Sequence, residues 1–143
     1  MSQFAEIFRQ AAQLNRQDAR RTGNTIELPS DAVVLASGDI HGHRHNFLKV
    51  IDYADLSENP RRVLVFQEII HGPIDPANGK DRSVDLIMRA ARLKIAYPQN
   101  VLFLLGNHDV AQLTGNEITK EGYGVCKAFN EGVGYAFGNR LAK

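Results

Sequence analysis

The sequence lacks several features that would place it in a specialised class of protein. It has one cysteine, Cys126, so it cannot form an internal disulfide, which fits a reducing compartment. No apolar run approaches the roughly 20 residues that span a membrane, and the N-terminus has no signal-peptide core. The formal net charge is only +1, and the basic residues form no block. We therefore expect a cytoplasmic protein that binds neither nucleic acid nor membranes; the oligomeric state is not predicted.

What the chain does contain is an alternation of extended and helical patterns. Short apolar strands are predicted at residues 32–37, 62–66 and 101–105, and apolar residues at helical spacing separate them at 47–54 and 84–95. This order predicts an α/β fold with a parallel β-α-β-α-β core and right-handed crossovers, in one compact domain of 143 residues. Asp85 and Arg89 are expected to pair on the later helix, and residues 127–135 are weakly helical.

Ahead of this core, apolar residues at helical spacing predict an amphipathic helix over about residues 3–20, in an N-terminal region that we place at 1–24. We expect it to pack on the core; a partner-binding arm is the alternative. The region also carries a local excess of arginine, which we expect to form a solvated helix face rather than a docking patch for anions: Arg9, Arg16, Arg20 and Arg21.

Two clusters of metal-ligand and proton-transfer residue types follow the first and last of these strands. Residues 38–42 read Gly-Asp-Ile-His-Gly, and residues 106–109 read Gly-Asn-His-Asp. In an extended segment, Asp39 and His41 point the same way and can reach one ion. Asn107 offers an amide oxygen, whereas the adjacent His108 points elsewhere and is the candidate for proton transfer. We expect both clusters to lie on loops.

Each cluster alone is compatible with an ordinary turn. Two clusters after two parallel strands favour a ligand site, because open α/β sheets bind ligands at the carboxyl ends of their strands. His43 and His45 lie close by in the sequence and can assist binding, but we expect exposed loop residues. Cys126 is expected to be a buried thiol rather than a nucleophile.

The two clusters resemble the first and third signature blocks of the calcineurin-like metallophosphoesterases. Residues 93–109 are similar to the serine/threonine protein phosphatase branch, and the similarity runs from about Val33 to the end of the chain. The resemblance implies that residues 25–143 form a metallophosphoesterase domain. Its expected fold is the N-terminal portion of a β-sandwich flanked by helices.

The resemblance also implies two divalent metal ions, of manganese, iron or zinc. By the family pattern, Asp39 and His41 bind the first ion, Glu68 bridges the two, and Asn107 binds the second. His108 then protonates the leaving oxygen. The substrate would be phosphorylated, either a phosphoprotein or a small phosphoester.

The middle block departs from the family pattern. Glu68 stands where the family has a bridging Asp, which moves the carboxylate outward by about 1.5 Å. His71 replaces the Asp that supports the acid histidine, and this removes the negative field that would raise the histidine pKa. Gly72 and Leu105 stand where arginines usually bind phosphate.

An insertion after this block offers a replacement for the missing arginines. Arg82 or Lys80 could turn toward the phosphate, but we favour a solvated Arg82, with Asp81 or Ser83 capping the next helix.

The family completes its second metal site with two later histidines, and residues 109–143 contain none. We therefore expect a domain truncated at its C-terminus and weak or single-metal binding by this chain. The leading hypothesis is a metal-dependent, protein phosphatase-like hydrolase of phosphate monoesters. A phosphoesterase-like binding or regulatory module without catalysis is the alternative. Specificity for dinucleoside polyphosphates or cyclic nucleotides is a third possibility.

Overall fold

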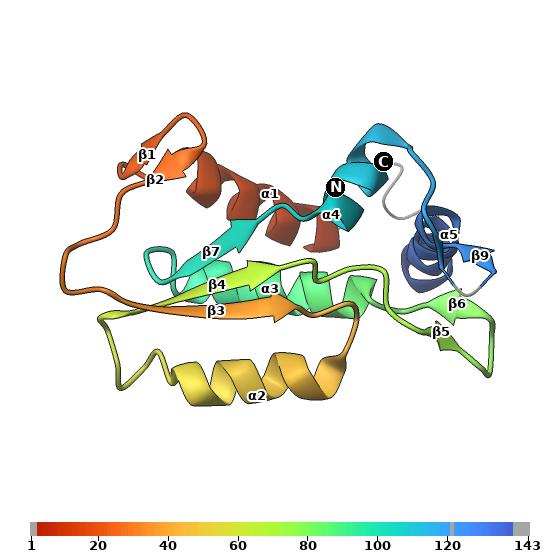
Figure 1. Cartoon of the computed structure of the whole chain (residues 1–143), viewed down its shortest axis with the longest axis horizontal. Coiled ribbons are helices and arrows are strands. Elements are labelled where there is room, and N and C mark those ends of the chain that lie inside the picture. The colour runs from red at the N-terminus through yellow and green to blue at the C-terminus, as the bar shows by residue number, and fades with distance from the viewer. Residues whose placement is uncertain (1–2, 121, 139–143) are drawn as a thin grey trace.

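The computed structural model of the chain describes residues 3–120 and 122–138. At its centre lies a parallel sheet with the order β3-β4-β7, built from Val33–Asp39, Arg62–Gln67 and Val101–Leu104 (Figure 1). This confirms the predicted parallel α/β core. Three short antiparallel pairs surround it: β1-β2 (Arg21–Thr22 and Thr25–Ile26), β5-β6 (Ile74–Asp75 and Lys80–Asp81) and β8-β9 (Thr119–Lys120 and Tyr123–Gly124).

The main hydrophobic core lies between the sheet and the two crossover helices, α2 (Arg44–Ala54) and α3 (Val84–Ala96). Side chains alternate along the central strand, so that Leu64 and Phe66 enter this core. The rings of Phe47 from α2 and Phe66 stack with centroids 5.0 Å apart, and both are fully buried. Burial of each ring contributes roughly 1.5–3 kcal/mol to folding.

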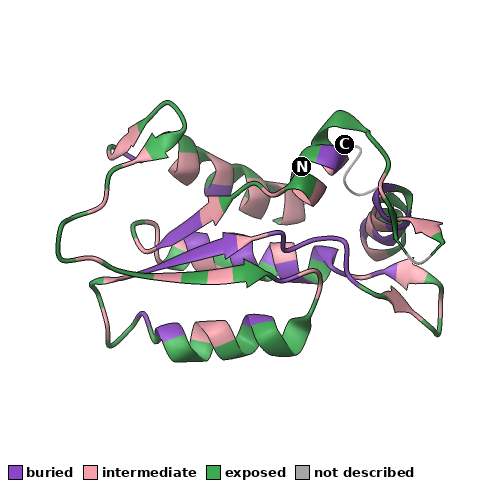
Figure 2. Cartoon of the chain, in the orientation of Figure 1, coloured by how far each residue is buried: buried purple, intermediate pink, exposed green. Residues whose placement is uncertain are grey.

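The opposite face of the sheet is covered more thinly. Val63, Val65 and Leu102 form a small cluster there under residues 26–32. Val34 on the edge strand β3 keeps 52% of its surface exposed, and Leu104 on β7 keeps 55%. Figure 2 shows the same asymmetry, with burial concentrated on β4 and exposure along β3. Most of the buried contacts that stabilise the sheet therefore lie on the face covered by α2 and α3.

The N-terminal helix α1 (Gln3–Arg16) packs on the core. Phe4 and Phe8 lie against a cluster formed by Met88 of α3 and Phe137 of α5 (Val125–Phe137). The helix ends before the predicted residue 20 because Asp18 Oδ1 accepts a hydrogen bond from the backbone N–H of Arg20, which stabilises a turn. The division into regions 1–24 and 25–143 stays a prediction.

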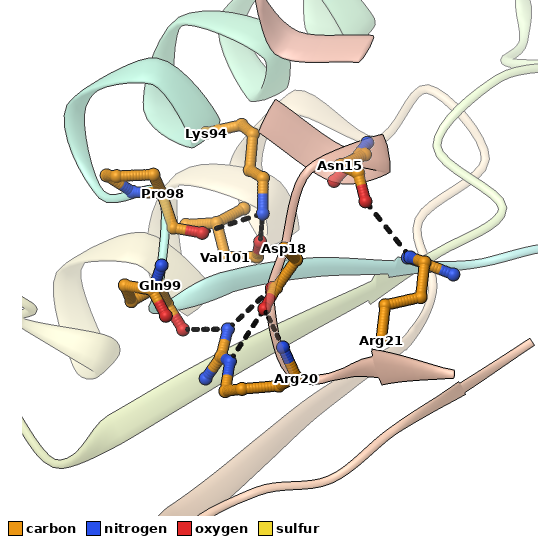
Figure 3. Close-up of polar contacts among 8 residues, drawn as sticks. All are labelled: Asn15, Asp18, Arg20, Arg21, Lys94, Pro98, Gln99 and Val101. Carbon is orange, nitrogen blue, oxygen red and sulfur yellow. Dashed lines mark hydrogen bonds and ion pairs between the residues drawn. The ribbon is translucent and has the colours of Figure 1, made fainter. Parts of the chain in front are cut away.

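Two neighbouring sets of hydrogen bonds, which we call the network near α1, lie just beyond the end of this helix (Figure 3). The Arg20 guanidinium donates to both carboxylate oxygens of Asp18, at 2.9 and 2.8 Å, and to the carbonyl of Gln99. Lys94 of α3 is fully buried, and its Nζ donates to the carbonyls of Pro98 and Val101.

The predicted solvated arginine face is confirmed for Arg9 and Arg16, which are exposed on α1, and is wrong for the other two arginines. Arg20 belongs to the network near α1, and Arg21 donates to the carbonyl of Asn15 (Figure 3). Arg9 pairs with Glu6 on the helix surface. Arg9, Arg20 and Arg21 each contact another residue of the chain, which argues against a docking patch for anions, as expected.

The C-terminal elements differ in part from expectation. Residues 107–114, predicted as loop, form the helix α4 (Asn107–Thr114), and α5 is longer than the weak pattern at 127–135 suggested. Gly132 of α5 lies so close to β6 that a Cβ there would fall 1.7 Å from the carbonyl oxygen of Asp81. The predicted end of the domain at residues 139–143 lies outside the described residues.

Cys126 on α5 is buried, as expected, and burial raises the pKa of its thiol. Within the described ranges, no helix has the length and apolar character needed to cross a membrane.

Candidate metal centre

Three chain segments meet at the carboxyl ends of the parallel strands. Residues 40–43 follow β3, residues 68–73 follow β4, and residues 105–108 follow β7. The first two are joined by backbone hydrogen bonds, from His41 N to Glu68 O at 2.7 Å and from Gly42 N to Ile69 O at 2.9 Å. The sheet thus places both predicted clusters and the middle block at one edge.

His41, Glu68 and His108 form a compact group of potential metal ligands. One donor atom from each lies within 4.8 Å of the others. The Glu68 side chain is only 2% exposed, and its Oε2 lies 3.2 Å from His41 Nε2. Its Oε1 accepts a hydrogen bond from the backbone N–H of His108 at 3.1 Å. A carboxylate this deeply buried requires nearby positive charge.

Gly106 makes room for the Glu68 side chain. A Cβ at residue 106 would lie 1.9 Å from Glu68 Oε1. The sequence suggested that the extra methylene of glutamate would move the carboxylate outward. The structure shows instead that the Glu68 side chain packs against Gly106, so the carboxylate stays in the site. Gly42 and Gly72 approach each other in a similar way, with a Cβ at residue 42 falling 2.4 Å from Gly72 Cα.

The backbone of this site is strained. His41, Glu68 and His71 have φ angles of 42°, 42° and 61°, in the left-handed region that non-glycine residues seldom occupy. Such strain costs of the order of 1–3 kcal/mol per residue and gathers at functional sites. It also corrects the assumption of a plain extended segment after β3. A register shift between Ala36 and Asp39 and the left-handed His41 break the simple alternation of side chains.

A series of hydrogen bonds through Gln112 and His71 fixes the orientation of the His108 ring. Gln112 Nε2 donates to Asn130 Oδ1, which leaves Gln112 Oε1 to accept from His71 Nε2 at 2.9 Å. His71 Nδ1 and His108 Nδ1 lie 3.1 Å apart, and the tautomer of His71 that donates through Nε2 accepts a hydrogen bond from His108 through Nδ1. The proton of His108 is therefore on Nδ1, and its Nε2 is the nitrogen free for an ion or a proton.

The electrostatics of the site favour a neutral His108. Burial lowers the pKa of His108, the neighbouring His41 lowers it further, and Glu68 opposes the shift. His71 also lowers it, in agreement with the expectation that an imidazole in place of aspartate removes the supporting negative field. Burial raises the pKa of Asp109, whose Oδ2 accepts a hydrogen bond from the N–H of Gly106 at 3.0 Å.

Asp39 and Asn107 lie at the rim of this group rather than inside it. Asp39 is exposed at the end of β3 and lines a cavity of about 310 Å³ together with His41 and His71. Asn107 is the exposed first residue of α4. The structure therefore brings Glu68, His41 and His108 together and leaves the other two predicted ligands more open to solvent.

Of the auxiliary histidines, His43 lines the same cavity, whereas His45 does not. Both are exposed, as expected, but His45 lies in the first turn of α2 rather than in a loop. Two further lining residues, Lys120 and Tyr123, gave no sequence signal.

The suggested arginine replacement does not form. Arg82 pairs with Asp85 at 2.9 Å and lies over the Tyr135 ring, and Lys80 pairs with Glu131 at 2.9 Å. The expected pairing of Asp85 with Arg89 is wrong, because Asp85 contacts Arg82 instead.

Gln112 is the supporting residue that sequence reasoning missed. It lies four positions after His108, so both side chains share one face of α4. The helical spacing would have revealed it had residues 107–114 been predicted as a helix.

The sheet, the three converging segments and the His-Glu-His group agree with the comparison with known families. A family model described as calcineurin-like phosphoesterase matches residues 32–140. The chain belongs to this family. The calcineurin-like phosphoesterases are metal-dependent and act on phosphorylated substrates, which gives the general class of the chain. No solved structure matches it.

The donors at the strand ends fit the divalent ions that such a phosphoesterase requires. Two imidazole nitrogens and a carboxylate suit zinc, iron or manganese better than magnesium or calcium. The buried Glu68 carboxylate would gain the compensating charge that its surroundings supply only in part.

Proposed function

We propose that the chain hydrolyses phosphate monoesters with bound divalent metal, with a preference for phosphoprotein substrates like that of the protein phosphatase branch. The observation that carries the proposal is the buried Glu68 carboxylate between His41 and His108, at the carboxyl ends of a parallel sheet. Family membership supports the reaction class, and the similarity of residues 93–109 to the protein phosphatase branch supports the substrate preference.

In the proposed site, His41 and Glu68 hold metal from the inside, and Asp39 and Asn107 complete the ligand set from the rim. When bound, the metal lowers the pKa of water and offsets charge on the phosphate. One ion fits this chain more readily than two, because the described ranges hold one compact group of possible ligands, in which His41 and Glu68 bind the ion and His108 is kept for proton transfer.

His108 is the proposed proton-transfer residue, and Nε2 is the atom at which the proton is held or released. When the His108 ring is neutral and its Nδ1–H is donated to His71, Nε2 carries a lone pair. It therefore takes up a proton before it can give one to a leaving oxygen. His71 acts as a positioning residue that fixes the ring and its tautomer.

The second candidate is a phosphoesterase-like module that binds without turnover. Two observations favour it: the lowered pKa of His108, which disfavours the acid form, and the absence of arginine at Gly72 and Leu105. This candidate requires metal or phosphate binding that persists while hydrolysis is absent.

A metal titration followed by an assay on p-nitrophenyl phosphate with manganese tests the proposal. We expect metal-dependent release of phosphate that Glu68→Gln abolishes and Glu68→Asp retains in part, because aspartate keeps the charge but withdraws the carboxylate by about 1.5 Å. Metal binding without hydrolysis would establish the second candidate. Two tight manganese sites per chain would contradict the single donor group.

The substrate class needs a separate comparison. Relative kcat/KM values on a phosphopeptide, p-nitrophenyl phosphate and a dinucleoside polyphosphate test the branch assignment. The protein phosphatase-like preference requires the phosphopeptide to be the best of the three. A higher value for the dinucleoside polyphosphate would replace it with the nucleotide alternative.

A further inference from the structure

A second cavity lies on the other side of the contact between Gly42 and Gly72. Its volume is about 450 Å³, within the range of small-ligand sites. Segments from α1, α2, α3 and α5 surround it, and four arginines are among its lining residues: Arg44, Arg82, Arg89 and Arg92. We call it the arginine cavity. It shares Gly72 and Pro73 with the cavity at Asp39 and His41.

The charge around the arginine cavity is not balanced. Arg82 pairs with Asp85, but no ion pair with a described residue is formed by Arg44, Arg89 or Arg92. The second carboxylate, Asp81, is 1% exposed and already accepts hydrogen bonds from the N–H groups of Gly72 and Ser83. The lining of this cavity therefore carries an excess of positive charge, which attracts anions.

Polar groups at the base of the cavity also lack partners. The Ser83 hydroxyl oxygen and Arg82 Nε are buried without a hydrogen bond of normal geometry, although the hydroxyl lies close enough to Asp81 to affect its pKa. Ser83 is only 3% exposed and precedes the first turn of α3, whose 13 residues point their N-terminal dipole at this region. The backbone N–H groups of Ser83, Asp85 and Leu86 are already bonded, so an anion here would be attracted by the helix dipole and bound by side-chain donors.

We infer that the arginine cavity binds a phosphate group, at a site separate from the metal centre. Phosphate matches the site because guanidinium groups bind its oxygens in pairs and because its negative charge balances the unpaired arginines. The phosphate can belong to a free anion. Alternatively, it is the second phosphate of a substrate that passes over Gly72 and Pro73, and this second source rests on the proposed function.

Calorimetric titration of the metal-free protein with inorganic pyrophosphate tests the binding. We expect one site per chain whose Kd rises about tenfold in Arg89→Gln and again in Arg92→Gln, with the loss of one charged contact each. Both residues are exposed on α3, so the fold should persist, and thermal melting checks this. Higher ionic strength should weaken the binding.

Arg16→Gln is the matched control, because it removes the same charge from an exposed helix position that does not line the cavity. Its Kd should equal that of the wild type. Glu68→Gln, at the metal centre, should also leave pyrophosphate binding intact. Absence of binding, equal affinity in the α3 variants, or loss of binding in Glu68→Gln would overturn the inference.

Kinetics with the metal-loaded protein separate the two sources of phosphate. If the site holds part of the substrate, Arg89→Gln raises the KM for a substrate with two phosphate groups and spares one with a single phosphate. If the site holds a free anion, both KM values stay equal to those of the wild type. The calorimetric result is independent of hydrolysis, so failure of this site and failure of the proposed function remain distinguishable.

Discussion

Two regions of the molecule bury charged side chains, and they do so in opposite ways. Near α1, the Asp18 carboxylate and the Lys94 ammonium have hydrogen-bond partners at ordinary distances. At the strand ends, Glu68 is buried and His108 is half-buried, yet His108 Nε2 forms no hydrogen bond with a described residue, and Glu68 faces a histidine that is charged only when protonated. The candidate site is therefore distinguished by side-chain atoms that are still free to bind a ligand, and not by burial.

The backbone sharpens this contrast. The non-glycine residues of the described chain with positive φ are His41, Asp55, Glu68 and His71, and three of them lie at the strand ends. The network near α1 contains none of them. Backbone strain combined with a ring nitrogen left free to bind a ligand marks a functional site, and fully paired side chains on relaxed backbone mark a structural one.

The largest effect should come from filling the space beside Glu68. Gly106→Ala places a methyl group where Glu68 Oε1 now lies, and the φ of −93° at this residue poses no other obstacle to alanine. We expect the rate of phosphoester hydrolysis to fall at least about 100-fold, because ligand geometry is sensitive to such displacements.

Gly134→Ala is its control, since a Cβ at this position of α5 meets no atom within 4 Å. Alanine there should leave hydrolysis unchanged and favour the helix slightly. Equal activity of the two variants would show that Glu68 does not need its present position.

On the structural side of the comparison, Lys94→Met should lower the free energy of unfolding by about 2–3 kcal/mol, because the carbonyls of Pro98 and Val101 each lose a buried donor. Chemical denaturation measures the change, with the exposed Lys49→Met as control. The specific activity of the folded fraction should stay constant. A stability within about 0.5 kcal/mol of the wild type would mean that the network is dispensable.

The same network predicts a dependence of stability on pH. Hydrogen bonds from Arg20 lower the pKa of Asp18 to about 2, below the unfolded value of about 3.9. The ionised group therefore contributes stability above about pH 4, roughly 2 kcal/mol, and this is lost as the pH falls toward 2. Asp18→Asn should remove the contribution. The difference in unfolding free energy between wild type and variant should shrink on acidification, and a constant difference would contradict the assignment.

The smallest effect concerns the support of His108. Gln112→Leu removes the acceptor for His71 Nε2, and we expect kcat to fall about tenfold with little change in KM, as for outer partners of metal-site histidines. Steady-state kinetics measure the split between the two constants. An equal rise in KM would indicate a general loss of structure instead. The Gln112→Glu variant, which keeps an acceptor, should restore most of kcat.

The sequence predicted the parallel core because its strands and helices carry strong periodic patterns, as at Leu64, Phe66 and the apolar side of α3. It also brought His41, Glu68 and His108 to one edge of the sheet. It did not predict that Asp39 and Asn107 are exposed at the rim of this group. Their placement depends on the register shift in β3 and on the start of α4, which are set by tertiary contacts and leave no periodic trace.

The network near α1 was equally hidden. Arg20 and Arg21 read as surface residues, because nothing local indicates that the carbonyl of Gln99, 79 residues later, accepts a hydrogen bond from Arg20. Long-range partners of this kind decide whether a charged side chain is buried or solvated, and composition and spacing do not contain them.

Gly132 of α5 lies close to the Asp81 carbonyl, and through this contact α5 helps to position the backbone at the candidate metal centre. Asp81 binds the N–H of Gly72, and Gly72 touches Gly42, next to His41. A side chain added at residue 132 would displace Asp81, and with it the contacts to Gly72 and Gly42. The position of a histidine after β3 is thus set partly by a helix that begins 84 residues later in the chain, at Val125.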